Sequence, residues 1–258
     1  MPPTPGPQLE RLLSCRNLPI RYLFIPKCGC TFVKNLLWRL DNGKIYPNPT
    51  RIHDVMDEFA RASQFDLTVE QVRAEEHCFV VLRNPVDRFL SLYFDKVVGE
   101  GYKKFVPLRE TLKNYGLNVE ARDPADHTRN CMIMIDWIET NLTTNNELPR
   151  DAHWSHQHWR GDTIKGFNMK MITISSLNSR LWLLLSDIIP DVEEIISQME
   201  RYATNSKDRK ESVLDATVKN RINKVYRRDR EIYEKLRDVW RKDNPKSSFE
   251  IPRADVIF

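Results

Sequence analysis

The sequence has few of the features that mark membrane-spanning, disulfide-rich or repetitive proteins. Its longest apolar stretch, residues 181–189, is interrupted by Ser186 and Asp187 and is far too short to span a bilayer. The five cysteines form no C-x-x-C pair, which argues against both a disulfide framework and a zinc ribbon. With 41% hydrophobic and 29% charged residues, the 258-residue chain has the composition of an ordinary globular protein.

The N-terminus also lacks the charged and apolar segments of a signal peptide. We expect residues 1–18 to form a flexible arm and residues 19–258 to form a single domain. Because the cysteines show no pairing pattern, we expect a cytoplasmic protein if the chain is full length. Removal of an N-terminal anchor would instead allow a location in the Golgi lumen.

Basic residues gather near the C-terminus although the net charge of +4 is mild. Residues 201–253 contain 16 Lys and Arg against 9 Asp and Glu, which fits either an anionic ligand or substrate or a solvated helix face. We expect no nucleic-acid partner. Lys207, Arg209 and Lys210 form a basic loop before the last expected helix. They either close over a nucleotide, meet an anionic acceptor or are simply solvated.

Apolar strands alternate with amphipathic helices along the chain. Residues 21–25, 78–82 and 169–174 are short apolar, β-branched runs typical of buried strands. The alternation predicts an α/β fold with a mainly parallel central sheet flanked by helices, whose ligands bind beyond the carboxyl ends of the strands. Helices are expected from Thr31 to a stop at Gly43, from Pro85, and near residues 179–189, 191–201 and 216–240.

The segment from Pro26 to Lys34 lies where the first strand passes into its helix. Backbone amides and a helix N-terminus can cradle a phosphate there, and Gly29 permits close approach. This is no Walker A loop, because the lysine, Lys27, precedes the glycine. Lys27 can therefore reach a bridging phosphate oxygen while Thr31 adds a hydroxyl. Alone, the segment is equally compatible with an ordinary strand–turn–helix junction.

A second segment, residues 81–91, places Arg83 at the carboxyl end of a strand and Ser91 two turns into the next helix. A guanidinium fork and a hydroxyl suit a second phosphate at some distance from the first. Taken separately, a salt bridge and a solvated serine explain these two residues better. Their occurrence together with the first segment favours a shared anionic ligand.

These two segments resemble the phosphate-binding motifs of sulfotransferases that use 3′-phosphoadenosine 5′-phosphosulfate (PAPS). They are most similar to the carbohydrate branch, which includes the chondroitin and HNK-1 enzymes. The resemblance implies a P-loop-like three-layer fold, PAPS as donor and a carbohydrate or glycoconjugate acceptor. It also implies that Lys27 contacts the leaving oxygen, that Gly29, Cys30 and Thr31 hold the 5′-phosphate, and that Arg83 and Ser91 hold the 3′-phosphate. From their positions in the sequence, Cys28, Lys207 and Lys210 are further candidate nucleotide contacts.

Two weaker similarities to that branch extend over most of the chain. One is His153-Trp154-x-x-Gln157, and the other is Val225-Tyr226-x-x-Asp229 followed by Tyr233. The sequence departs from the branch at His156, where proline is usual. Trp154 and Trp159 either stack on sugar faces or pack in the core.

In-line sulfuryl transfer requires stabilisation of the leaving oxygen and a base for the acceptor hydroxyl. His53 is our first candidate for the base and His153 the second, while Asp54 could orient or replace His53. No metal is expected, because a sulfuryl group carries less charge than a phosphoryl group. The three histidines of residues 153–158 are an alternative metal site, but their spacing is not a recognised zinc pattern.

Two other functions compete with this hypothesis. A magnesium-dependent, kinase-like nucleotide enzyme is disfavoured by the missing Walker A signature. A non-catalytic module that binds anionic glycans through its basic face is the alternative outside catalysis. Direct transfer also requires no covalent intermediate, so we expect neither Cys28 nor Cys30 to be a nucleophile.

Overall fold

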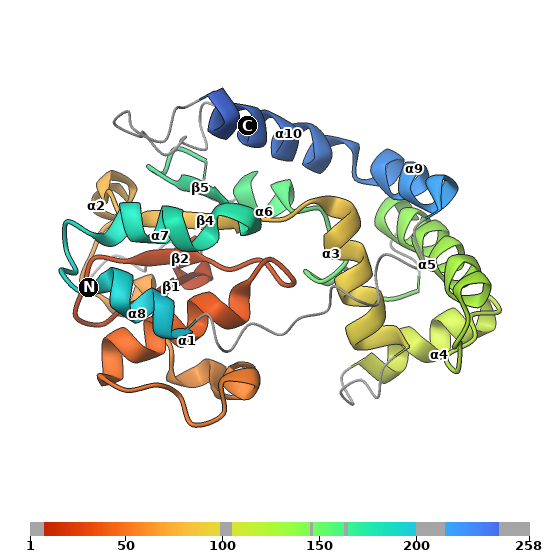
Figure 1. Ribbon diagram of the computed structural model, residues 1–258, viewed down its shortest axis with the longest axis horizontal. Coiled ribbons are helices and arrows are strands. Elements are labelled where there is room, and N and C mark those ends of the chain that lie inside the picture. The colour runs from red at the N-terminus through yellow and green to blue at the C-terminus, as the bar shows by residue number, and fades with distance from the viewer. Residues whose placement is uncertain (1–7, 99–104, 145–146, 163–164, 200–214, 243–258) are drawn as a thin grey trace. The chain divides into compact units, whose positions relative to one another are not determined.

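The structure is a computed structural model that describes residues 8–98, 105–144, 147–162, 165–199 and 215–242 (Figure 1). The chain folds into two compact units. The first comprises residues 1–83, 158–204 and 232–258, and the second comprises residues 84–157 and 205–231. Within the described residues, no helix combines the length and the hydropathy that a membrane span requires.

The first unit is built on a mixed five-stranded sheet with the order β3-β1-β2-β4-β5. β2, β4 and β5 are parallel, whereas β1 pairs antiparallel with both β2 and β3. The prediction of a mainly parallel sheet is therefore wrong, because parallel and antiparallel pairings occur together. The strands are β1 (Leu12–Ser14), β2 (Arg21–Leu23), β3 (Ala60–Arg61), β4 (Cys78–Leu82) and β5 (Lys170–Thr173).

The antiparallel part arises from residues that we had expected in a flexible arm. Leu9–Arg11 forms a short 3₁₀ helix, η1, and β1 follows it directly. Leu9, Leu12 and Leu13 are fully buried, so residues 9–14 belong to the core. The amide of Cys15 donates to the carbonyl of Ile20 at 3.2 Å, and so short a connection forces an antiparallel pair.

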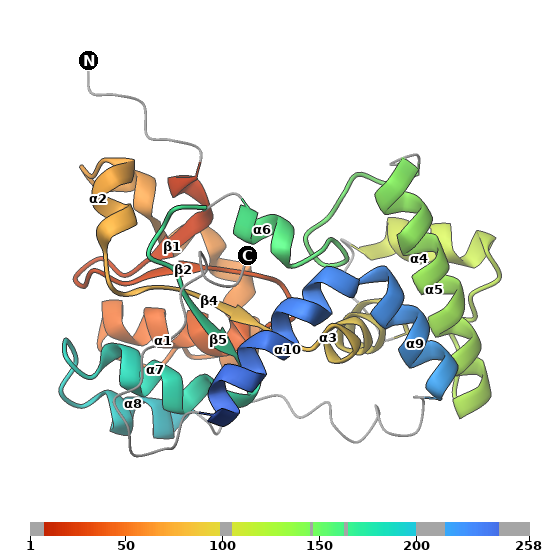
Figure 2. The ribbon, with the colours of Figure 1, turned by 90° about the horizontal axis from the view of Figure 1, so that it is seen from above.

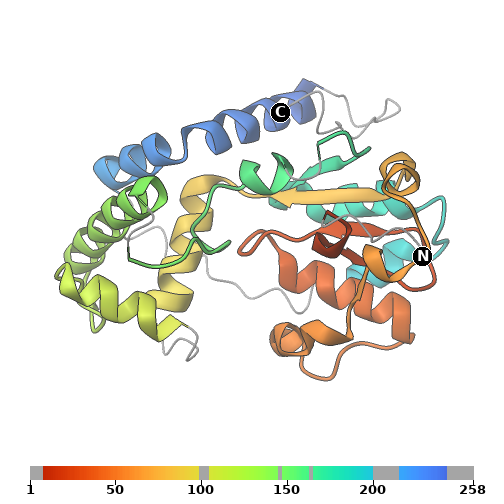
Figure 3. The same ribbon diagram turned by 180° about the vertical axis from the view of Figure 1, so that it is seen from behind.

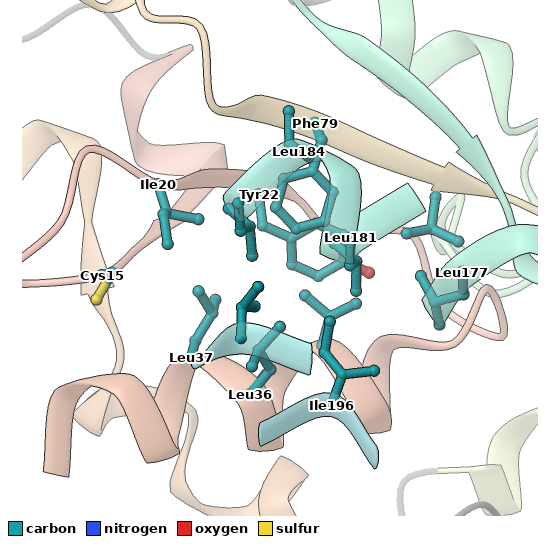
Figure 4. Packing of buried hydrophobic residues seen from close by; sticks show 14 of the residues in the cluster. Cys15, Ile20, Tyr22, Leu36, Leu37, Phe79, Leu177, Leu181, Leu184 and Ile196 are labelled. Carbon is teal, nitrogen blue, oxygen red and sulfur yellow. The ribbon is translucent and has the colours of Figure 1, made fainter. Parts of the chain in front are cut away.

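Successive strand residues point to opposite faces of the sheet and create two cores, as a pleated strand requires. Tyr22, Phe79, Val81 and Ile172 pack against the helices of one face (Figure 4). Leu23, Val80, Leu82 and Met171 pack on the other face. The helices of the first face are α1 (Cys30–Asn42), α7 (Leu177–Leu185) and α8 (Val192–Met199), and those of the second are α2 (Val69–Ala74) and the C-terminal part of α10 (Arg227–Lys242), seen crossing β5 in Figure 2.

The helix α1 positions the first phosphate-loop segment. Its buried face is formed by Val33, Leu36 and Leu37, which repeat at helical spacing. Gly43 ends the helix in the left-handed conformation, with its amide donating to the carbonyl of Arg39 at 2.8 Å. The predicted stop at Gly43 is confirmed. Further short elements of this unit are η2 (Pro49–Glu58), η3 (Ala62–Gln64), α6 (His158–Asp162) and η6 (Ile174–Ser176).

The described part of the second unit is helical (Figure 3). Asn84 caps its first helix by accepting from the amide of Val86 at 2.9 Å, and Pro85 occupies the first turn as predicted. The single helix expected over residues 216–240 is two helices, because the backbone leaves the helical region at Tyr226. The helices are α3 (Pro85–Leu92), η4 (Tyr93–Val97), α4 (Val106–Asn114), α5 (Pro124–Thr144) and α9 (Ala216–Val225).

Candidate functional site

The two predicted phosphate-binding segments meet at the carboxyl edge of the sheet. β2 and β4 are neighbouring parallel strands, so the loop after β2 and the residue after β4 emerge at the same edge. There, Nη1 of Arg83 donates to the carbonyl oxygen of Lys27 at 3.0 Å. This contact joins a guanidinium to the backbone of the lysine loop across 56 residues of sequence.

The loop itself has an unusual backbone. Lys27 adopts a left-handed conformation with φ of 68°, which costs a non-glycine residue about 1–2 kcal/mol. Gly29 is also left-handed, with φ of 75°. A Cβ on Gly29 would lie 3.3 Å from Leu177 Cδ2 and 3.5 Å from Ile174 Cδ1. The left-handed conformation favours glycine at this position, and the limited space beside it adds to that preference.

The N-terminus of α1 can receive an anion. Gly29 is the N-cap residue, and no side chain in the described part of the chain caps it. The amides of the first helical turn therefore point outward with the positive end of the helix dipole. Cys28 anchors the loop from within, since its amide donates to Ile25 at 3.3 Å and its side chain is fully buried. Cys30 begins the helix and is only 7% exposed.

His53 comes from η2 and lies against the same helical turn. Its Nε2 is 2.9 Å from Thr31 Oγ1, and its Nδ1 is 2.8 Å from Nζ of Lys34. Asp54, the next residue, accepts from the exposed Arg51 at 2.7 Å. His53 thus contacts both the phosphate loop and a lysine of α1.

Lys34 was missed as a functional candidate. It is 1% exposed, and burial lowers the pKa of its ammonium group from 10.5 to about 8. A signal existed in the sequence, since Lys34 follows Thr31 by three residues and so shares its side of the helix, next to the apolar residues Val33 and Leu37. Lysine is rarely buried without a specific reason.

A cluster of hydroxyl groups after β5 was also missed. Thr173 Oγ1 lies 3.0 Å from Ser175 Oγ and 2.8 Å from Ser176 Oγ. Thr173 pairs in register with Leu82, the residue before Arg83. Three hydroxyls thus stand at the carboxyl end of the third parallel strand, and serine or threonine after such a strand was the available signal.

The second segment divides between the two units. Arg83 ends the first unit, whereas Ser91 lies half-buried on α3 in the second. Arg88 is 3% exposed and donates to the carbonyls of Ser155 at 2.9 Å and Ala152 at 2.6 Å. Arg88 therefore stabilises a loop of its own unit that contains Ala152 and Ser155.

That loop, residues 151–157, contains His153. Asp151 Oδ1 accepts from the His153 amide at 2.7 Å and lies 2.6 Å from its Nδ1. The hydroxyl of Tyr226 donates to Trp154 O at 2.6 Å, and Asp229 Oδ2 accepts from the Gln157 amide at 2.7 Å. The two weaker family similarities thus contact each other within the second unit.

The two tryptophans considered for sugar stacking differ in burial. Trp154 is 5% exposed and packs edge-on against Trp137, so packing is its main function. Trp159 is half-buried in α6 of the first unit. His156 and His158 fall in different units. Lys207, Arg209 and Lys210 lie outside the described residues.

Comparison with known proteins identifies the family of the chain. The family model described as "Sulfotransferase family" matches residues 10–235, which include both predicted phosphate-binding segments and the 151–157 loop. No curated protein and no solved structure matches the chain. Because the model covers most of the sequence, the chain belongs to the sulfotransferase family, whose members transfer sulfuryl groups.

Proposed function

We propose that this protein transfers a sulfuryl group from PAPS to a hydroxyl group of a carbohydrate or glycoconjugate. The observation that carries the proposal is the 3.0 Å hydrogen bond from Arg83 to the carbonyl of Lys27. It holds the guanidinium of Arg83 at the same sheet edge as the backbone of the Lys27 loop, which supports a ligand with phosphates at both ends. The carbohydrate acceptor rests on the resemblance of the motifs to the carbohydrate branch.

Each residue of the first segment has a chemical function in this proposal. The amine of Lys27 stabilises the negative charge that develops on the leaving phosphate oxygen. Gly29, Cys30 and Thr31 hold the 5′-phosphate at the N-terminus of α1. Arg83 and Ser91 hold the 3′-phosphate, with Lys207 and Lys210 as further nucleotide contacts.

During transfer, the bond between sulfur and the phosphate oxygen breaks as the bond to the acceptor oxygen forms, and the acceptor proton passes to a base. His53 is the first candidate for this base, and His153, beside Asp151, is the second. Ionised Asp151 only accepts hydrogen bonds, so the neutral ring carries its hydrogen on Nδ1 and keeps a lone pair on Nε2. A sulfuryl group carries less charge than a phosphoryl group, so the proposed reaction needs no metal.

The experiment is a calorimetric titration with 3′-phosphoadenosine 5′-phosphate (PAP) and, separately, ATP, combined with transfer of labelled sulfate from PAPS to glycan acceptors. We expect PAP to bind more tightly than ATP. Arg83→Met should weaken PAP binding about 10–100-fold, because a charge-assisted hydrogen bond contributes about 1.5–3 kcal/mol. Lys44→Ala, which removes an exposed lysine of the same unit, is the matched control.

Equal affinity for PAP and ATP, together with magnesium-dependent turnover of ATP, would show a kinase-like enzyme instead. Binding of sulfated glycans without PAP binding or sulfate transfer would show a non-catalytic module. Either result contradicts the proposed function.

A further inference from the structure

The burial of Lys34 demands an explanation. Its Nζ lies 2.8 Å from His53 Nδ1, 2.8 Å from Met56 Sδ and 4.4 Å from the centre of the Phe24 ring. None of these three partners is an anion. Burial of a charge without a counter-ion is costly, so this lysine is a poor choice for stability alone.

The contacts of Lys34 determine where His53 carries its hydrogen. An ammonium group has three donors and no acceptor, so Nδ1 of His53 must accept from it. The neutral ring then carries its hydrogen on Nε2, which is 2.9 Å from Thr31 Oγ1. Because Thr31 accepts this hydrogen bond, its own hydroxyl hydrogen is directed elsewhere.

We propose that Lys34 is a positioning residue at the start of a hydrogen-bond relay, in which His53 and then Thr31 each donate onward and the Thr31 hydroxyl donates to the bound anion. The relay brings the polarising effect of a buried charge to the phosphate loop, because consecutive hydrogen bonds strengthen one another in a low-dielectric interior. It assigns His53 the function of a donor, whereas we had first considered it as the base. The identity of the anion as the 5′-phosphate of PAPS rests on the proposed function.

Other charged and titratable groups near the relay set its pH range. Burial is the largest cause of the lowered pKa of Lys34, at about 8; Cys30 opposes it and Arg61 of β3 adds to it. The guanidinium of Arg160 lies 6.0 Å from the centre of the same Phe24 ring. The charged residues of α8, which packs against α1, are the exposed Glu193 and Glu194. Below about pH 8, Lys34 is therefore the cation that the relay requires.

A double-mutant cycle on PAP affinity tests the coupling between the two ends of the relay. Lys34→Met should weaken PAP binding about tenfold at pH 7, the equivalent of one charge-assisted hydrogen bond. In a Thr31→Val background, which lacks the terminal hydroxyl, the same Lys34→Met change should have almost no further effect. Lys44→Met, on the exposed lysine, is the control. Additive effects of Lys34→Met and Thr31→Val would overturn the relay.

Imidazole ¹⁵N NMR of the ligand-free protein tests the first link without any nucleotide. At pH 7, His53 should show a hydrogen on Nε2 and an acceptor signal from Nδ1, and the Nδ1 signal should shift with a midpoint near pH 8. Lys34→Met should abolish this pH-dependent shift of the Nδ1 signal. A hydrogen on Nδ1 of the wild-type protein at pH 7 would overturn the proposal. Failure of the proposed function would instead appear as absence of PAP binding in every variant, with the NMR result intact.

Discussion

The two predicted phosphate-binding segments, residues 26–34 and 83–91, are built differently. Residues 26–34 contain two left-handed residues and a helix N-terminus without a side-chain cap. In residues 83–91, the side chain of Arg83 donates a hydrogen bond to the backbone of the first segment. Arg88, which belongs to the same motif, instead holds the carbonyls of Ala152 and Ser155. One motif can therefore contain both residues proposed to contact the ligand and residues that support the structure. The burial and the hydrogen-bond partners of each side chain distinguish the two kinds.

The substitution Lys27→Gly should have the largest effect, which is on the rate of sulfuryl transfer. Loss of the amine should lower the transfer rate about 10²–10³-fold, as removal of one donor that stabilises a developing oxyanion does. Glycine accepts the φ of 68° without strain, so the free energy of unfolding should stay within about 1 kcal/mol of wild type. Labelled-sulfate transfer and urea unfolding measure the two quantities. Retained transfer would mean that the first segment acts through its backbone alone.

The next effect concerns how Lys34, in the first segment, makes the free energy of unfolding depend on pH. The pKa of Lys34 falls from 10.5 to about 8 in the folded state, so between these values the unfolded chain binds more protons. Wild type should therefore gain stability relative to Lys34→Met as the pH rises through this window, by roughly 3 kcal/mol in total. Unfolding of both proteins at pH 7, 9 and 10 checks this. A constant difference would show that the pKa of Lys34 is the same in the folded and unfolded states.

Arg88→Met sharpens the contrast within the second segment. Two hydrogen bonds from a buried guanidinium are lost, so the free energy of unfolding should decrease by about 2–3 kcal/mol. PAP affinity of the folded variant should change far less than in Arg83→Met. Calorimetric titration below the unfolding temperature compares the two variants. Equal losses of PAP affinity in Arg88→Met and Arg83→Met would show that Arg88 is not merely a structural support.

The smallest effect is expected for Ser91→Ala. A neutral hydroxyl contributes about 1 kcal/mol, so PAP affinity should fall by less than about tenfold while ATP affinity stays unchanged. Competition titrations with the two nucleotides provide the measurement. An equal decrease for both nucleotides would show that Ser91 does not distinguish the 3′-phosphate.

Local sequence patterns predicted the elements that depend on local physics. The strand at residues 78–82 has the predicted bounds, and the helix after Thr31 ends at Gly43 as expected, because apolar periodicity and a left-handed stop are local signals. β1 and β3 were missed, since runs of two or three residues show no periodicity and are defined only by their partners. The break at Tyr226 was missed because the apolar repeat continues across it.

The candidate site was predictable in its parts but not in its connections. Residue types and spacing identified Lys27, Gly29 and Arg83. They did not reveal that Lys34 contacts His53, because that contact depends on how η2 returns to α1. Likewise, the hydrogen bond from the Gln157 amide to Asp229 joins residues 72 positions apart and follows from tertiary packing alone.

The limited space between Gly29 and the side chains of Ile174 and Leu177 has a consequence for protein engineering. A side chain added at Gly29 would contact these two aliphatic side chains, so residues of the hydrophobic core limit the space beside the loop. Libraries meant to change acceptor preference should therefore keep these three positions fixed and diversify elsewhere.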